Sequence, residues 1–472
     1  MSAISAFEML SIGIGPSSSH TLGPWRALLL FEKECVKQGL SLQKLTAINI
    51  HLYGSLALTG KGHATDKAVL LGLSGANYES DSEESFRKIL AEIYAKKQVL
   101  AFKKHIIRFD PEEQIIFHRK ALKEHANGII IEAHFGTIEL EVTYFSVGGG
   151  FVVNKSDFTS KQEPNYTYIY PSNHGKDLLN HCNLHGKKIS DLVLENEIDR
   201  YGADYVHKRF SAIWNVMLEA MYTGCHTEGE LPGGLRVIRR AAAMNQSLIV
   251  DTQYNSAREW LAAIRRSEVK FRQILQWVSA FAIAVNEVNA SMGRVVTAPT
   301  NGSAGVIPAV LMYYLVIENH DAGSNEIERF LAIAAEVGTL FKKNATLSAA
   351  MGGCQAEIGV SSAMAAAALT ELMGGTPEQC LSAAEIAMEH HLGLTCDPIA
   401  GLVQIPCIER NSMGAIKAIN ASELALGRKT GETRVSLDQI IETMWDTAKN
   451  MSTKYKETSQ GGLAIKVNLS DC

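Results

Sequence analysis

The chain has 472 residues, of which 46% are hydrophobic and 20% charged, with a formal net charge of -5. This composition is typical of a soluble globular protein, the length favours two domains, and the small negative charge without a long Lys/Arg run argues against a nucleic-acid surface. The first fifteen residues contain no basic residue ahead of an apolar run, and no apolar run reaches about 18 residues, so we expect neither a signal peptide nor a membrane span.

The first part of the chain has the pattern of a mixed α/β fold. A helix is expected over residues 23–39 and a strand over 45–52. Residues 137–144 alternate apolar and polar side chains, which predicts a strand, and 128–135 is its expected partner across a turn at Gly136. After a polar, loop-like stretch at 153–164, residues 166–170 are the last expected strand.

From about residue 171 onward the apolar residues recur with helical spacing. The expected helices cover 205–222, 258–289, 305–318, 325–343, 358–373, 376–391, 414–426 and 436–451. Residues 358–373 are rich in small side chains, which let helices approach closely, so we place this helix deep in the domain. The sequence therefore predicts an α+β protein: an N-terminal α/β domain with a mixed sheet (1–170) and an all-α domain (171–472).

Three of the eight cysteines lie at breaks in the regular pattern. Cys354 follows two glycines, Cys396 precedes Asp-Pro, and Cys407 follows a proline. Backbone at such breaks can turn toward a ligand, so these thiols could hold zinc or an iron–sulfur cluster, or could merely pack. The chain has no C-x-x-C pair, which disfavours zinc, whereas a cluster accepts wider spacing. The wide separation of all eight, without an export signal, predicts reduced thiols and a cytoplasmic protein.

The segment around two of these thiols, residues 393–411 (GLTCDPIAGLVQIPCIERN), resembles the cluster-binding segment of single-chain iron–sulfur L-serine dehydratases, or L-serine ammonia-lyases. Four further segments are similar to the same family: residues 15–21, 54–66, 146–151 and 298–305. All five occur in the family's order and span nearly the whole chain. A single glycine-rich match would mean little, but five in order are specific.

The resemblance implies a carbon–nitrogen lyase that dehydrates L-serine to aminoacrylate, which then gives pyruvate and ammonia. It implies a [4Fe-4S] cluster on Cys354, Cys396 and Cys407, with one open iron acting as Lewis acid. In the single-chain type the last residue, Cys472, is expected to cap that iron. The resemblance also implies a homodimer, a β-chain-like first domain and an α-chain-like second domain. Cys35, Cys182, Cys225 and Cys380 are interpreted as packing residues.

Two histidines in the family segments are the candidates for acid–base chemistry, because histidine titrates near neutral pH. We favour His63 as base or hydroxyl donor and His20 as a positioning group, with Lys61 as a further candidate. For the substrate carboxylate, hydroxyls and backbone N–H groups are offered by turns and by the start of a helix. These candidates are Ser17, Ser18, Ser19, Thr21, Gly148, Gly149, Thr300 and Asn301. If segments of both halves line one pocket, it lies at the domain interface.

Three alternatives stay open at this point. A pyridoxal-phosphate dehydratase runs the same net reaction, but the Ser-Phe-Lys setting of that family is not found here. A non-catalytic iron–sulfur sensor would not need the serine, histidine and glycine segments. A cluster-dependent hydro-lyase of a hydroxy acid would call for more arginines than these motifs contain.

Overall fold

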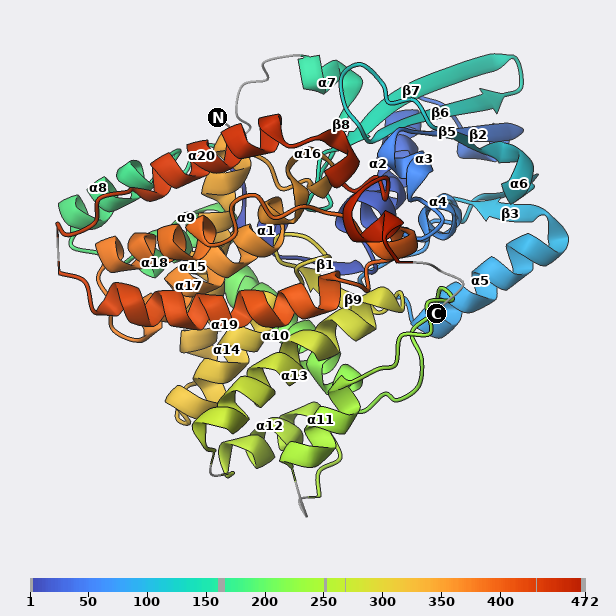
Figure 1. Cartoon of the computed structure of the whole chain (residues 1–472). Helices are drawn as coiled ribbons and strands as arrows, with labels where there is room; N and C mark the ends of the chain where they lie inside the picture. Colours follow the sequence, from blue (N-terminus) through green and yellow to red (C-terminus); the bar gives the residue numbers. More distant parts are fainter. Residues whose placement is uncertain (1–2, 160–165, 250–252, 268, 430, 468–472) are drawn as a thin grey trace.

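The computed structural model describes residues 3–159, 166–249, 253–267, 269–429 and 431–467, and it confirms the predicted α+β fold (Figure 1). A mixed sheet with its covering helices lies beside a larger, helical part. Across these ranges, we find no helix with the length and apolar character needed to cross a membrane.

The sheet has five strands in the order β5-β2-β6-β7-β8. Their bounds are β2 (Ala47–Tyr53), β5 (Ile115–His118), β6 (Gly128–Phe135), β7 (Ile138–Ser146) and β8 (Val152–Asn154). β2 is parallel to β5 and antiparallel to β6, so the sheet is mixed, as predicted. Side chains of β2 alternate between buried and half-buried, and the buried face packs on α2 (Gly23–Lys37) and α4 (Thr65–Leu73).

Smaller elements complete this part of the chain. They are α1 (Ala6–Met9), α3 (Ser55–Leu58), α5 (Glu83–Lys96), β3 (Gln98–Ala101), β4 (His105–Arg108), α6 (Pro111–Gln114) and α7 (Lys155–Thr159). β3 and β4 form a separate antiparallel hairpin.

Helix α17 (Ile358–Leu372) lies at the centre of the helical part and packs against α15 (Ser324–Asn344), α18 (Pro377–Glu389) and α19 (Cys407–Leu426). Its alanines are fully buried, which confirms the deep position predicted from its small side chains. The remaining helices are α8 (Gly175–His185), α9 (Ile189–Tyr201), α10 (Ala203–Cys225), α11 (Ala241–Leu248), α12 (Ala257–Arg265), α13 (Phe271–Ala290), α14 (Val306–Tyr313), α16 (Ala349–Gly352) and α20 (Leu437–Asn450).

The first residues of the chain pack into the helical core. β1 (Ser11–Ile14) pairs antiparallel with β9 (Arg294–Thr297), and Phe7, Met9 and Leu10 belong to the same hydrophobic core as α15 and α17. The boundary near residue 171 stays a prediction. Whatever its position, residues 6–14 are built into the helical part, and the pairing of β1 with β9 carries residues 15–21 to the junction of the two parts.

Several local predictions were wrong. Residues 166–170 form no strand, because Tyr168 and Tyr170 donate hydrogen bonds from their hydroxyls to carboxylates of α9 and hold the segment against that helix. The expected single helix at 258–289 is two helices, α12 and α13, and a new N-cap begins the second, where Lys270 N donates to Gln273 Oε1 (2.9 Å). The stretch 153–164, expected as loop, includes part of β8 and all of α7.

Candidate active site

The three predicted thiols are buried near the junction of the two parts. Cys354 lies in the 3-10 turn after α16, Cys396 lies in an extended segment, and Cys407 is the first residue of α19. The ligand atoms of Cys354, Cys396 and Glu357 all lie within 4.8 Å of one another. Gly353 makes this turn possible, because its φ of 71° favours glycine and an added Cβ would lie 2.7 Å from the carbonyl O of Leu394.

Arg410, one turn into α19, ties this group together. Its Nη1 donates to Cys354 Sγ (3.1 Å) and to the carbonyl O of Thr395 (2.6 Å), and Nη2 lies 3.5 Å from Asp397 Oδ1. The hydrogen bond from the Cys396 thiol, together with the Arg410 charge, lowers the pKa of Cys354 to about 7 in spite of burial. Burial and the neighbouring Cys354 raise the pKa of Glu357 to about 8. The pocket therefore favours one thiolate at Cys354.

His20 and His63 come from different segments and lie ring against ring, with their centroids 4.6 Å apart and no exposed surface. His63 Nδ1 must carry a proton, because it lies 2.9 Å from the carbonyl O of Thr59, which only accepts. His63 Nε2 is therefore an unprotonated nitrogen, and it has no hydrogen-bond partner. Burial lowers the pKa of His63 to about 4, so the ring is neutral near pH 7.

The other ring, His20, is hydrogen-bonded at both nitrogens. The hydroxyl of Ser55 donates to the carbonyl O of Glu457 (3.0 Å), so it accepts from His20 Nε2 (3.0 Å). His20 Nδ1 then accepts from the hydroxyl of Ser19 (2.9 Å). Burial, with the neighbouring His63, lowers the pKa of His20 well below its ordinary value. This chain of bonds fixes the orientation of His20, whose positioning role stays a prediction.

Residues 453–467, which we call the C-terminal strap, cross the site (Figure 1, red coil beside α3 and α4). The strap pairs with the cysteine segment, because Cys396 N donates to the carbonyl O of Tyr455 (2.8 Å) and Glu457 N donates to that of Cys396 (2.9 Å). Further along, Leu463 N donates to Asp397 Oδ2 (2.6 Å). The Glu457 carboxyl lies with Oε1 3.7 Å from His20 Nδ1 and 3.7 Å from His63 Nε2.

The predicted substrate-binding residues meet around the same junction, but several of their polar groups are used within the protein. Thr21 Oγ1 donates to the carbonyl O of His63 (2.7 Å), and the Ser17 hydroxyl accepts from His20 N (3.2 Å). Asn301 Nδ2 donates to Asn289 Oδ1 (3.1 Å), while Asn301 Oδ1 is buried without a partner. The Thr300 hydroxyl bonds to the Glu357 carboxyl. Ser18 is buried in the same turn.

The glycines of residues 148–150 join the two parts of the protein. Gly148 forms a bridge with Leu347, and Gly149 packs near the carbonyl O of Pro299. Both have positive φ, 89° and 61°, so the turn depends on glycine. The backbone here supports the loops that carry Thr300 and Cys354, and whether it also binds substrate stays a prediction.

The remaining candidates divide into three groups. The Lys61 side chain is exposed, unlike the buried ring of His63 two residues later, so its geometry gives no support to a catalytic role. Cys472 lies outside the described residues. Cys35, Cys182, Cys225 and Cys380 are buried and free, as expected of packing residues.

Sequence reasoning missed three side chains of the site: Arg410, Glu357 and Glu457. The first two lie within segments that the thiols had already marked, where a charged residue three positions after a buried cysteine was the available signal. Glu457 belongs to no recognised motif. The two adjacent glycines at 461–462 were the signal there, because a Cβ on Gly462 would lie only 1.8 Å from Asp397 Oδ2.

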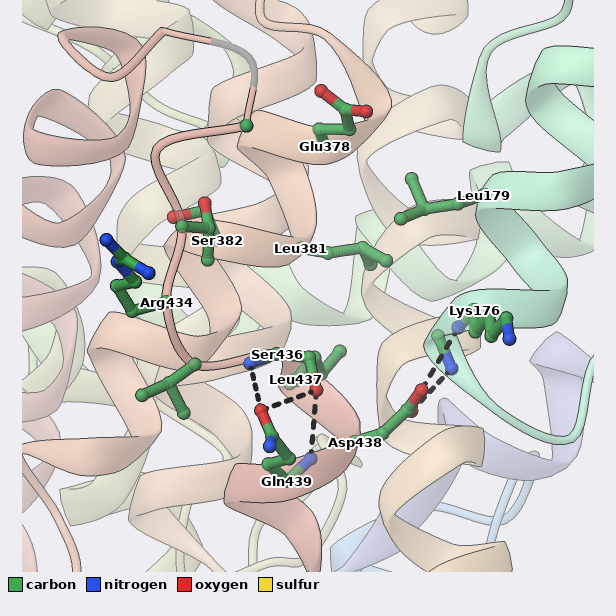
Figure 2. A pocket seen from close by; sticks show the side chains of 14 residues that line it. Lys176, Leu179, Glu378, Leu381, Ser382, Arg434, Ser436, Leu437, Asp438 and Gln439 are labelled. Atoms are coloured by element: carbon green, nitrogen blue, oxygen red, sulfur yellow. Dashed lines mark hydrogen bonds between the residues drawn. The ribbon is translucent and has the colours of Figure 1, made fainter.

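A cavity elsewhere on the molecule, between α8, α18 and the segment before α20, contains none of the predicted site residues (Figure 2). Its volume is about 390 Å³, and Asp438 on its wall accepts from the backbone N of Gly175 (2.6 Å) and of Lys176 (3.1 Å). The start of α8 is therefore already paired with a carboxylate. None of the described residues that line this cavity has a buried polar side-chain atom without a partner, unlike His63, Asn301 and Glu457 at the candidate site.

The mixed-sheet part and the helical part that bears the cysteines match two serine dehydratase families in turn. The "Serine dehydratase beta chain" family matches residues 5–157, and the "Serine dehydratase alpha chain" family matches residues 184–464. The chain is 45% identical to the L-serine dehydratase of Haemophilus influenzae, over 98% of this chain and 99% of that protein. It is 43% identical to L-serine dehydratase 2 of Escherichia coli (99% and 100%) and 46% identical to the L-serine dehydratase of Streptomyces coelicolor (100% and 100%). The chain therefore belongs to the L-serine dehydratase family, which confirms the resemblance seen in the five segments.

Proposed function

We propose that this protein is an L-serine ammonia-lyase that dehydrates L-serine to aminoacrylate, from which pyruvate and ammonia form, with a [4Fe-4S] cluster as cofactor. One observation carries the proposal: the buried thiols of Cys354 and Cys396 and a neutral histidine with an unprotonated, unpartnered nitrogen lie at the same junction. This combination fits the two demands of the reaction, assistance to a poor leaving group and removal of a weakly acidic α-proton.

The donor set fits a cluster. Cys354, Cys396 and Cys407 are buried and free, and the Arg410 guanidinium offsets the negative charge that deprotonated thiols bring into a buried site. These three residues would hold the cluster, which when bound supplies a Lewis acid for the substrate hydroxyl. The family resemblance implies that Cys472 caps the open iron, and this stays a proposal.

The protein's own residues would bind the substrate and move the proton. His63, neutral at pH 7, accepts the α-proton at Nε2, because its Nδ1 is already committed to the carbonyl O of Thr59. His20 holds its ring against that of His63 and is itself held by Ser19 and Ser55. The buried, unpartnered Asn301 Oδ1 and the turn of residues 17–21 are offered to the remainder of the substrate.

The test is pyruvate formation from L-serine by protein purified without oxygen, repeated after exposure to air and after treatment with ferrous iron and a reductant. We expect activity that is lost in air and regained on reconstitution. Turnover that is indifferent to air, with absorbance of an internal aldimine, would instead identify a pyridoxal-phosphate enzyme. An intact cluster with no turnover would leave the sensor and the other hydro-lyase. A homodimer in the cytoplasm stays a prediction, which light scattering and cell fractionation would check.

A further inference from the structure

The carboxyl group of Glu457 is buried beside the two histidines without a cation of its own. Its side chain is 6% exposed, and Oε2 has no hydrogen-bond partner. His63 Nε2, which lies 3.7 Å from Glu457 Oε1, is also buried without a hydrogen-bond partner. Unpartnered buried polar atoms on two neighbouring side chains mark a place where a polar ligand group is missing.

We propose that Glu457 binds the α-ammonium group of the substrate. The inference rests on the proposed function and deepens it, since it assigns the group that distinguishes an amino acid from a plain hydroxy acid. Within the described ranges, Glu457 forms no ion pair with a lysine or an arginine, and the two histidines beside it are held neutral by burial. Its other titratable neighbours are acids, and burial, together with Glu357 and Cys354, raises the pKa of Glu457 well above its ordinary value. A buried carboxylate is costly unless it is paired, and an ammonium ion is the partner that a serine ligand brings.

The position agrees with the chemistry of the substrate. In serine the ammonium group and the proton to be removed are attached to the same carbon atom. The group that binds the ammonium must therefore be a neighbour of the base. Glu457 Oε1 lies at equal distances, 3.7 Å, from His63 Nε2 and His20 Nδ1, so an α-carbon placed before His63 has Glu457 beside it.

The second acidic side chain of the site, Glu357, has a different setting. Its carboxyl group, whose pKa is raised to about 8, has an oxygen within 4.8 Å of the thiol sulfurs of Cys354 and Cys396, accepts a hydrogen bond from Thr300, and is near the Arg410 charge. Glu357 thus lies on the thiol side, already provided with a donor and a cation. Glu457 lies on the histidine side, where the backbone N of Ala350 donates to its carboxyl group, Oε2 has no partner and no cation among the described residues pairs with it, so it is the better partner for the ammonium group.

The strap fixes Glu457 in place. Its N donates to Cys396 and its carbonyl accepts from Ser55, so its backbone is held by both parts of the protein. Its φ is 56°, in the left-handed region that non-glycine residues seldom adopt. Such a conformation persists where the surroundings impose it, which is typical of residues that must present a side chain to a ligand.

The experiment compares two ligands in the wild type and in Glu457→Gln, with the cluster reconstituted anaerobically. L-serine carries the ammonium group, and 3-hydroxypropanoate is the same molecule without it. We measure KM and kcat for L-serine, inhibition by 3-hydroxypropanoate, and direct binding of each from the change in the electron paramagnetic resonance or absorbance spectrum of the cluster. The control is Glu442→Gln, an exposed glutamate on α20.

For Glu457→Gln we expect L-serine to bind about 10- to 100-fold more weakly, the scale of one lost charge-assisted hydrogen bond. Binding of 3-hydroxypropanoate should change less than about threefold, since the cluster and the histidines are intact. An equal loss for both ligands, or no loss for either, would overturn the assignment. If Glu457→Gln does not fold, Glu457→Asp decides by the same comparison of the two ligands. Absence of pyruvate from the wild type would refute the proposed function instead, so the two failures are distinguishable.

Discussion

Gly62 lets the His63 loop lie directly against the loop between Cys396 and Cys407. A Cβ placed on Gly62 would lie 2.8 Å from the carbonyl O of Gly401 and 3.0 Å from that of Ala400. Both obstacles are backbone atoms, so they cannot move aside as a flexible side chain would. Gly62→Ala should therefore push the histidine loop away from the cysteine loop by several tenths of an ångström.

The expected cost follows from this overlap. Overpacking a close contact costs about 1–3 kcal/mol, and a displacement near 1 Å between catalytic groups costs up to about 100-fold in rate. We expect kcat/KM for L-serine to fall about 10- to 100-fold, mostly in kcat, while iron content stays near that of the wild type. The assay is anaerobic pyruvate formation, with iron per chain and the melting temperature measured on the same samples.

The matched control is Gly427→Ala, because the nearest atoms to a Cβ there lie at 3.6 Å and 3.8 Å, which is ordinary contact. This variant should keep wild-type kinetics. If Gly62→Ala also has a kcat/KM within about twofold of the wild type, the two loops do not need this close approach, and the argument that both parts jointly build the site fails.

Four further outcomes are expected. Cys396→Ala should lose bound iron and activity while keeping its helical circular dichroism, whereas the buried packing variant Cys380→Ala should keep its iron. Arg410→Lys removes the planar guanidinium that bonds Cys354, Thr395 and Asp397, so its cluster absorbance should bleach in air about 10-fold faster. Burial lowers the pKa of His391 to about 4, from about 6.5 in the unfolded chain. The free energy of unfolding should therefore be highest above pH 6.5 and fall as the pH drops toward 4, where the unfolded chain binds a proton that the folded protein does not. In His391→Gln this fall, measured by urea unfolding, should be smaller by up to about 3 kcal/mol. Gly224→Ala puts a Cβ 2.3 Å from the carbonyl O of Ala284, between α10 and α13, and should cost about 1–3 kcal/mol in the same unfolding assay, in contrast to Gly427→Ala.

Local patterns in the sequence predicted much of the fold. The alternation of residues 137–144 predicted β7, and the small residues of 358–373 predicted the buried helix α17. In both cases the pattern of side chains along the element itself was sufficient. The pairing of β1 with β9 was beyond such reasoning. Each strand has only four residues, all but Arg294 buried, so neither shows an alternation, and their partners lie 286 positions apart at Ser11 and Thr297.

Candidate site residues were found where a motif marked them. His20, His63 and Cys396 lie in segments that the family resemblance singled out, and Cys354 was marked by the two glycines before it. The structure brings the two histidines together, and likewise Cys354 and Cys396. The sequence favoured His63 and kept Lys61 as a further candidate, since the two lie in one motif and differ by orientation. In the structure the His63 side chain is buried and that of Lys61 is exposed. The sequence of residues 60–63 does not determine which way each side chain points.

The contacts that build the site explain why the rest could not be read from the sequence. Main-chain carbonyls make many of the bonds that build the site. The carbonyl of Thr59 sets the protonation of His63, and that of Thr395 holds Arg410. The carbonyls of Tyr455 and Cys396 bind the strap to the cysteine segment. Every residue has a backbone carbonyl, so the sequence does not show which carbonyls make these bonds. For this reason the sequence did not reveal Glu457 as a residue of the site. Its place beside the histidines is set by backbone pairing with Cys396, which lies 61 residues earlier in the chain. A substitution next to Cys396 that breaks this pairing should displace Glu457 as surely as replacing Glu457 itself.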